Sequence, residues 1–358
     1  MKNSDIINYR LLNQQIAETK FSKPEEIVSW MIAMQAQEFA MAKWALGLRL
    51  PKCSDAVIDK VFNEGAILRT HLMRPTWHFV TPTDIRWMLA LTAPRVHTVN
   101  SFMYRKSNFD KSILKRSNDT LAKALQGGKH LTRIELQAAL LKETIKADGI
   151  PLSLLMMCAE LDGIICSGAR KGKQFTYGLL DEIVPGVKPF HREEVLAGFT
   201  RRYFGSRGPA TLKDFVTWSG LTMKDARDGV LKLSSEFIHK NNNGQDYILK
   251  ETLLTTKNKI QKTFLLPDYD EYGMSYKDRS ALFLPANKPE MNKGGNGAYQ
   301  HIIVINGTIG GTWKRTIKNN KINIETTSFK VLNKTDQQEV KKAVEKYTLF
   351  IGKDLDDK

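Results

Sequence analysis

The sequence predicts an α+β protein with three tandem winged helix-turn-helix units followed by a β-rich C-terminal domain. Two observations lead to this fold class. Helix-start signals recur along the chain, and each is followed by further helical periodicity and then by a strand–turn–strand pattern. Beyond Gln261, strand-forming residues dominate instead. We expect the three units at 1–120, 121–185 and 186–258, and the β-rich domain at 259–358.

The first expected unit contains three helices and then a hairpin. Its first helix starts at a capping box, Ser22-Lys23-Pro24-Glu25, and buries a stripe formed by Ile27, Trp30, Met31 and Met34. The remaining elements are helices at 40–48 and 55–64 and strands at 67–70 and 77–80. Helices that are followed by a short hairpin are typical of a winged helix.

Two later segments repeat this order of elements with little letter-for-letter identity, so the repeat is one of architecture. The second unit opens with a capping box at Thr132 and has a helix at 151–161. Its strands at 164–167 and 174–177 flank a basic, glycine-rich turn, which is typical of a wing that faces DNA. The third unit opens with a capping box at Thr211, has the turn of its helix-turn-helix at 218–221 and ends in strands around 241–244.

The β-rich domain is predicted from strand-forming runs at 262–266 and 299–305. Asn306-Gly307 is a strong hairpin turn, and a last helix is expected from Thr335. A segment at 287–297, rich in glycine and asparagine, is expected to form a loop.

The composition favours a protein that binds polyanions. The chain has 54 Lys and Arg against 38 Asp and Glu, which gives a net charge of +16 over 358 residues. This excess favours nucleic acid as the partner first and an acidic membrane surface second. The alternative is a soluble protein that is basic without binding a polyanion. Three winged helices on one chain strengthen the case for nucleic acid.

The compartment follows from the cysteines and from the absence of targeting signals. Cys53, Cys158 and Cys166 are odd in number and lack C-x-x-C spacing, so we expect neither a disulfide framework nor a zinc site. The polar residues 1–10 rule out an ordinary signal peptide, and no apolar run approaches the roughly 18 residues of a membrane span. We therefore expect a cytoplasmic, nucleoid-associated protein with no membrane partner.

Several motifs are more specific than this pattern. They are 34–37 (MQAQ), 68–78 (LRTHLMRPTWH), 265–272 (LLPDYDEY) with 276–279 (YKDR), and 305–307 (ING) with 310–315 (GGTWKR). In this order, over roughly the whole chain, they resemble the AlkZ/YcaQ family of bacterial DNA glycosylases. The sequence departs from the usual motifs at Pro75, where many members have Gly, and at Asp268, where an uncharged residue is usual.

The resemblance implies a basic DNA channel and a catalytic Gln-x-Gln motif, here Gln35 and Gln37. Residues two apart share a side of a strand but not of a helix, so the first helix must end near Met34 or Gln35 if both serve one site. Otherwise they are ordinary polar residues at a helix end. Asp270 is a third catalytic candidate, which would steady the oxocarbenium ion or a water. Alternatively it caps a loop or pairs with Arg279.

Basic and histidine residues on the matching motifs and on the second hairpin are the candidates for DNA contact. They are Arg69, His71, Arg74, His78, Arg170, Lys171, Lys173 and Arg279. Each basic residue is alternatively a solvated surface charge. His71 and His78 flank the first hairpin, where a structural role competes with a role in the pocket or on DNA.

The leading hypothesis is a monofunctional DNA glycosylase that needs no metal and no cofactor. Alkylation at N7 or N3 makes a purine cationic and a good leaving group, so glutamines that hold the water and the sugar suffice. The expected partner is double-stranded DNA with alkylated bases, bound by a monomer, and interstrand crosslinks are a further candidate substrate. The main alternative is a winged-helix DNA-binding regulator without enzymatic activity, and a scaffold for protein partners is the third.

Overall fold

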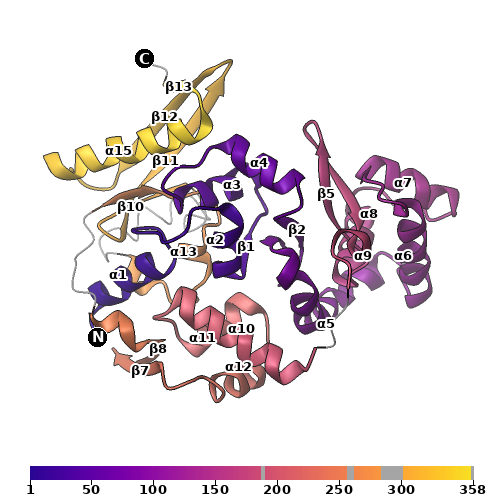
Figure 1. Cartoon of the computed structure of the whole chain (residues 1–358), viewed down its shortest axis with the longest axis horizontal. Helices are drawn as coiled ribbons and strands as arrows, with labels where there is room; N and C mark the ends of the chain where they lie inside the picture. The colour runs from indigo at the N-terminus through magenta and orange to yellow at the C-terminus, as the bar shows by residue number, and fades with distance from the viewer. Residues whose placement is uncertain (187–189, 256–261, 284–300, 356–358) are drawn as a thin grey trace. The chain divides into compact units, whose positions relative to one another are not determined.

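The computed structural model describes residues 1–186, 190–255, 262–283 and 301–355 (Figure 1). The fold is α+β, as the sequence predicts. The chain forms two compact units. The terminal body comprises Met1–Ile58, Ala197–Trp218 and Thr222–Lys358, and the central body comprises Asp59–Leu196 and Ser219–Leu221. The loop predicted at 287–297 lies outside the described residues.

The N-terminal part of the terminal body carries the Gln-x-Gln segment. It consists of α1 (Asn3–Asn13), α2 (Pro24–Met31), β1 (Ala33–Gln35) and α3 (Phe39–Leu48), and α4 (Asp55–Asn63) spans the boundary between the bodies. The start of α2 is capped by Glu26, which accepts the N–H groups of Ser22 and Lys23 at 3.0 and 2.9 Å. The sequence placed this role on Glu25, one residue too early.

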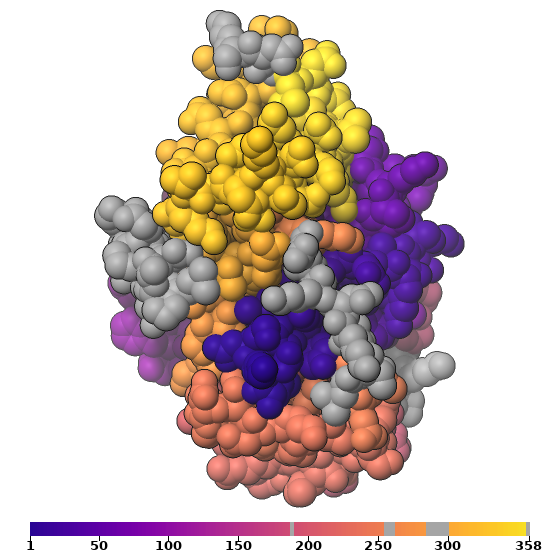
Figure 2. Space-filling view, turned by 90° about the vertical axis from the view of Figure 1, so that its left-hand side faces the viewer, coloured from indigo at the N-terminus to yellow at the C-terminus, as the bar shows by residue number. Residues whose placement is uncertain are grey.

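The third helix–hairpin segment belongs largely to the terminal body. It contains α10 (Arg192–Arg207), α11 (Leu212–Ser219), α12 (Met223–Val230), β7 (Phe237–Asn242) and β8 (Gln245–Lys250). The capping box predicted at Thr211 is present, because Thr211 and Asp214 exchange backbone and side-chain hydrogen bonds at 2.8 and 3.1 Å. In Figure 2 this segment (salmon) lies below α1 (indigo), and α15 (Lys334–Ile351, yellow) lies above.

The C-terminal sheet confirms that the end of the chain is rich in strands. Its five strands run in the order β13 (Asp354–Leu355), β12 (Lys321–Ser328), β11 (Thr308–Lys318), β10 (Ile302–Ile305) and β9 (Thr263–Leu265). The short elements η1 (Glu251–Thr255), α13 (Glu271–Met274) and η2 (Ser280–Leu282) precede or interrupt it. Asn306 and Gly307 have φ of 51° and 85°, as the predicted hairpin turn requires.

An aromatic core joins this sheet to the N-terminal helices of the terminal body. The ring of Tyr347 on α15 lies 4.9 Å from Trp44 on α3 and 4.9 Å from Trp313 on β11. Both tryptophans also donate their indole N–H to backbone carbonyls of the 265–266 segment, at 2.7 and 2.8 Å. The motif 265–272 is therefore held from both sides by buried rings.

The central body contains helices followed by a β-hairpin, the order of elements that the sequence predicts for its second unit. Its elements are β2 (Leu68–His71), β3 (Trp77–Val80), α5 (Pro82–Lys106), α6 (Lys111–Leu125), β4 (Leu131–Thr132), α7 (Arg133–Lys142), α8 (Gly149–Leu161), β5 (Ile165–Lys171), β6 (Gln174–Leu179) and α9 (Leu180–Ile183). Every residue of α8 from Leu154 to Leu161 is buried, so this helix is core and offers little surface for reading bases. The β5–β6 hairpin is buried along most of its length and exposed at its tip, residues 171–174. Among the described residues, no helix combines the length and apolar composition that crossing a membrane requires.

Candidate functional site

Gln35 lies at the end of β1, in extended backbone. The preceding helix α2 ends at Met31, so the condition that the sequence sets for a shared site of Gln35 and Gln37 is met. Gln35 is 8% exposed, and Gln37 is half-buried just beyond the strand. Side chains two residues apart on an extended strand project to one side, whereas on a helix they do not. Gln37 lies in the bend that follows β1, so a side shared with Gln35 stays a prediction.

Ile32 forms the junction between α2 and β1 in an unusual conformation. Its φ of 65° places a β-branched side chain in the left-handed region, although the residue is completely buried. Such a conformation costs on the order of 1–3 kcal/mol and persists only where the surroundings enforce it, often at functional sites. The chain therefore enters the Gln-x-Gln segment through a bend that other contacts must hold.

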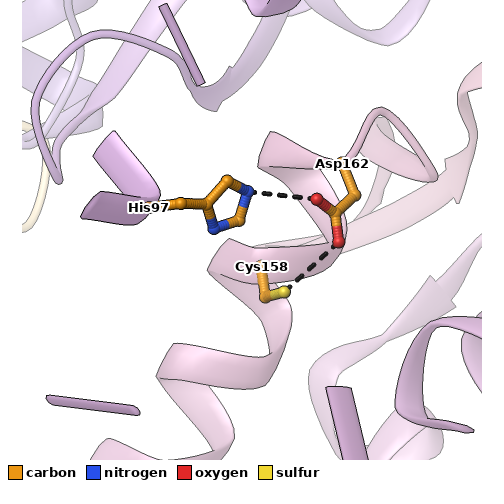
Figure 3. Close-up of side chains that lie close together, drawn as sticks. All are labelled: His97, Cys158 and Asp162. Atoms are coloured by element: carbon orange, nitrogen blue, oxygen red, sulfur yellow. Dashed lines mark hydrogen bonds and ion pairs between the residues drawn. The ribbon is translucent and has the colours of Figure 1, made fainter. Parts of the chain in front are cut away.

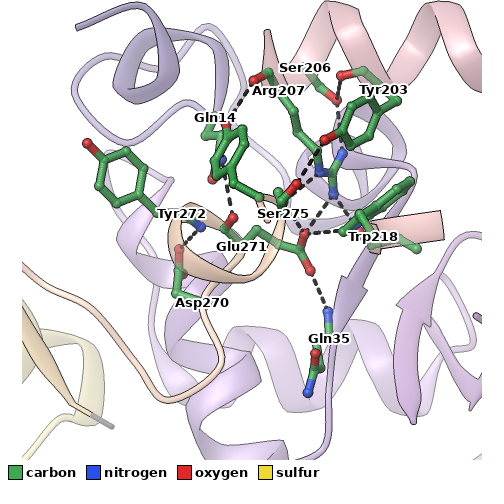
Figure 4. Close-up of polar contacts among 12 residues, drawn as sticks. Gln14, Gln35, Tyr203, Ser206, Arg207, Trp218, Asp270, Glu271, Tyr272 and Ser275 are labelled. Atoms are coloured by element: carbon green, nitrogen blue, oxygen red, sulfur yellow. Dashed lines mark hydrogen bonds and ion pairs between the residues drawn. The ribbon is translucent and has the colours of Figure 1, made fainter. Parts of the chain in front are cut away.

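Glu271 on α13 provides the first of these contacts (Figure 4). Its Oε1 accepts the backbone N–H of Gln35 at 2.9 Å. Its Oε2 accepts three further donors: the indole of Trp218 at 2.9 Å, the hydroxyl of Ser275 at 2.7 Å and the guanidinium of Arg207 at 3.0 Å. The carboxylate is 1% exposed, so all of these bonds are made without competition from water.

Arg207 on α10 provides the second contact. The same Nη2 that meets Glu271 also donates to the backbone carbonyl of Ala33 at 2.9 Å, and Nε donates to Ser275 at 2.8 Å. The carbonyl of Ala33 and the N–H of Gln35 are thus both fixed by one buried ion pair. This ion pair determines the path of β1, and with it the point from which the side chain of Gln35 departs.

The ionisation of Glu271 reflects this environment. Burial alone would raise its pKa, but the positive charge of Arg207 and the hydrogen bonds from Ser275 and the Gln35 amide outweigh burial and hold the pKa at about 2. Glu271 is therefore an ionised anchor and holds no proton to donate near neutral pH.

Asp270, the neighbouring residue, is anchored just as firmly. Its two oxygens accept both guanidinium nitrogens of Arg49 at 2.8 Å each, and Oδ1 also caps α13 by accepting the N–H of Tyr272 at 2.8 Å. The sequence had offered Arg279 as the ionic partner, but Arg279 donates instead to the carbonyl of Gly273 at 2.7 Å. Since both oxygens of Asp270 have buried partners, the geometry favours a positioning role for it; its catalytic role stays a prediction.

The basic residues that the sequence predicts for a DNA-facing wing lie on the β5–β6 hairpin of the central body. At the tip of the β5–β6 hairpin Lys171 and Lys173 are exposed, and Lys171 approaches Glu135 at 3.3 Å. Arg170 makes an ion pair with Asp59 at 3.2 Å. Both ion pairs would have to exchange partners when a phosphate binds. The cost is modest for the exposed Lys171–Glu135 pair, because surface pairs are weak.

Aromatic rings support two arginines, Arg170 on this hairpin and Arg69 on β2. The guanidinium of Arg69 lies 4.4 Å from the ring of Trp77 and 4.8 Å from that of Phe175. Arg170 lies 5.2 Å from the same Phe175 ring. An aromatic ring holds a stacked guanidinium in a fixed plane, which suits contact with a phosphate backbone. Arg170 also donates to Asp59 and to the carbonyl of Lys173, so it would have to exchange these partners.

Comparison with known proteins then decides the family. A family model described as DNA glycosylase AlkZ-like matches residues 28–350. The chain belongs to this family. It is 22% identical over 334 residues, 86% of each protein, to an interstrand DNA cross-link repair glycosylase of Streptomyces sahachiroi. The solved Streptomyces sahachiroi DNA glycosylase AlkZ has the same fold, with a TM-score of 0.81 over 99% of this chain and 98% of that chain at 19% identity.

Family membership confirms that the protein is a DNA glycosylase and that DNA is its substrate, and it disfavours the non-enzymatic regulator. Within the glycosylase, the predicted histidines have internal partners. His71 is 7% exposed, with Nδ1 bonded to the carboxylate of Glu160 and its ring 4.4 Å from Trp77. His78 is fully buried, and its Nδ1 meets the carbonyl of Thr76 at 2.9 Å. DNA contact by either histidine stays a prediction, as it does for Arg74, which lies half-buried in the β2–β3 turn with φ of 57°.

Sequence reasoning missed the residues that hold the Gln-x-Gln segment of the glycosylase. Glu271 was visible as part of an acidic pair, but nothing in the sequence indicated that it would bind a main-chain N–H 236 residues away. Arg207 lies on a helix that the sequence did not predict, and Arg49 follows the last residue of α3 without a motif of its own.

Proposed function

We propose that this glycosylase hydrolyses the N-glycosidic bond of purines alkylated at N7 or N3, with Gln35 and Gln37 as its catalytic residues. The observation that carries the proposal is the buried Glu271–Arg207 pair, which binds the main chain of β1 at the carbonyl of Ala33 and at the N–H of Gln35. A main chain fixed in this way positions a side chain within the narrow tolerance that catalysis needs.

The chemistry follows from the charge of the damaged base. An alkylated purine is cationic, so its bond to the sugar breaks with the electron pair leaving on the base and no general acid is required. Positive charge develops on the sugar and a water attacks the anomeric carbon. A glutamine carbonyl accepts a hydrogen bond from that water and faces the positive charge, while the released proton passes to solvent. An undamaged purine is neutral and needs a proton before it can leave. Glutamine supplies no such proton and is not a strong base, so undamaged bases are spared.

DNA contact is assigned to the arginine and lysine side chains of the β5–β6 hairpin together with Arg69, supported by the net charge of +16. The curated relative is named for interstrand cross-link repair, so crosslinked purines are proposed as substrates alongside simple alkyl adducts. The proposal further includes a monomeric enzyme, a cytoplasmic location and association with the nucleoid.

Base release from defined duplexes tests this function. The purified protein is incubated with duplexes that carry one N7-methylguanine, an N7-linked interstrand crosslink or no lesion, and released base and strand integrity are measured separately. We expect an abasic site in an intact strand, and no release from the undamaged duplex. Strand cleavage without added base, or a borohydride-trapped covalent complex, contradicts the monofunctional mechanism. Tight DNA binding without release from either lesion contradicts the substrate assignment.

A further inference from the structure

Three metal-ligating side chains meet in the central body, outside the site described above (Figure 3). His97 comes from α5, Cys158 from α8, and Asp162 is the C-cap of α8. His97 Nε2 lies 3.0 Å from Asp162 Oδ1, and Cys158 Sγ lies 3.3 Å from Asp162 Oδ2. One ligand atom from each residue lies within 4.8 Å of the others.

We propose that His97, Cys158 and Asp162 bind a zinc ion that joins α5 to α8. Zinc prefers a tetrahedron of nitrogen, sulfur and oxygen ligands at about 2.0–2.3 Å, which places neighbouring ligand atoms roughly 3.3–3.8 Å apart. The observed separations are close to this range, so small side-chain adjustments open the space for the ion. Cys158 and Asp162 stand four residues apart on one helix face, a spacing that lets one helix supply two ligands.

The outer contacts of these side chains match those of a metal centre. His97 Nδ1 lies 3.1 Å from the hydroxyl of Tyr104, which can accept a hydrogen bond from the Nδ1–H and so leave Nε2 as the ligand nitrogen. Asn118 on α6 donates to Asp162 Oδ2 at 2.6 Å and orients the carboxylate. A histidine and a carboxylate that are each oriented by a further hydrogen bond are typical of ligated metal sites.

Charge and access also fit a divalent ion. A neutral imidazole, a thiolate and a carboxylate together balance two positive charges, and the thiol proton of Cys158 passes to solvent when the ion binds. All three side chains line one open pocket of about 530 Å³, together with Asn118 and Lys115. This opening admits the ion and leaves room for a water as the fourth ligand.

The position of the site indicates a structural role. Beside it, Val96 and Tyr104 of α5 pack on Met157 and Leu161 of α8 in one apolar cluster. A bound ion would cross-link the same two helices at the edge of that cluster and raise the stability of the central body, since an ion that binds only the folded state stabilises it. From the sequence we expected no zinc site, because His97 lies on a different helix from Cys158 and Asp162 and the three residues form no spacing motif.

Cobalt titration tests the proposal, because a thiolate bound to Co²⁺ absorbs in the near ultraviolet and the ion replaces zinc at such sites. The full chain is first stripped with a chelator and then titrated with Co²⁺, and Zn²⁺ is added as competitor. Cys158→Ser and His97→Gln are compared with Cys53→Ser, which removes a thiol elsewhere. His97 has a side chain that is 27% exposed, so its variant is expected to fold even if the buried Cys158→Ser variant does not.

We expect one Co²⁺ per chain, a thiolate band that Zn²⁺ abolishes, and a melting temperature that rises on Zn²⁺ addition. The band should persist in Cys53→Ser and vanish in Cys158→Ser, and His97→Gln should weaken Zn²⁺ binding at least about tenfold, as loss of even an outer partner does. A parent protein without the band, or a band that moves with Cys53, overturns the proposal. Equal Zn²⁺ affinity in His97→Gln and the parent overturns it as well.

Discussion

The carboxylate of Glu271 accepts the backbone N–H of Gln35 at 2.9 Å, although 236 residues separate the two. The contact uses the main chain of Gln35 and leaves its side-chain amide out of this interaction. On the other side of the carboxylate, Arg207 holds the carbonyl of Ala33. A glutamine that is to position water and sugar is thereby fixed at its backbone by a buried ion pair.

Replacing Glu271 by glutamine should disturb both stability and catalysis. The amide leaves Arg207 as a buried charge without its ionic partner, which typically costs about 3–5 kcal/mol. Its NH₂ group would also face a donor, so β1 should shift and base release should slow by at least about tenfold. The melting temperature is measured first, and single-turnover release and affinity for undamaged DNA are then measured at a temperature below it. The exposed Glu64→Gln is the control, and a parent-like Glu271→Gln would contradict the anchoring role.

The low pKa of Glu271 predicts that the free energy of unfolding decreases in the acid range. The pKa of Glu271 is about 2 in the folded chain against an ordinary value of 4.5, so its contribution is present above pH 4.5 and is lost as pH falls toward 2. The free energy of unfolding, measured by denaturant titration between pH 6 and 3, should fall more steeply for the parent than for Glu271→Gln. Parallel pH profiles of the two proteins would show that this carboxylate is not specially stabilised.

The melting temperature and the rate of base release of Asp270→Asn together distinguish a positioning role from a catalytic one. Asp270→Asn breaks a bidentate pair with Arg49 in which both side chains are at most 2% exposed, so we expect a loss of about 3–5 kcal/mol in unfolding free energy. Where the variant is still folded, base release should stay within about tenfold of the parent. An unchanged melting temperature with a 10²-fold slower reaction would instead support direct catalysis. Asp119→Asn, at an exposed position, is the control.

How much the sequence could predict differs between the fold and the site. Capping boxes at Thr132 and Thr211 and the Asn306-Gly307 turn are local signals, and the structure contains all three. The long helix α5 was missed, because it contains Pro94 and its apolar residues face several neighbours. Gln35 was found through a motif, whereas Arg207 was not, because its function depends on tertiary contacts with Glu271 and Ala33 that no local pattern encodes.

Removing the basic wing should weaken DNA binding without regard to sequence. The triple change of Arg170, Lys171 and Lys173 to alanine removes up to three phosphate contacts. The slope of log K against log salt should then decrease by about 2–3, since each contact contributes about 0.9. The affinities for different undamaged duplexes should fall together. Exposed Lys115 and Lys224, changed together to alanine, are the control. An unchanged salt slope in the triple variant would place the DNA contact elsewhere.

The central claim is that Gln35 and Gln37 act on one reacting sugar, and single-turnover release of base from an N7-alkylguanine duplex tests it most directly. Gln35→Ala and Gln37→Ala should each slow release on the order of 10²-fold, with melting temperature and affinity for undamaged DNA nearly unchanged. Gln37→Asp should be the mildest change, because a carboxylate also accepts from water and faces positive charge. If the parent excises the base and both alanine variants lose less than about threefold, the two glutamines are not the catalytic pair.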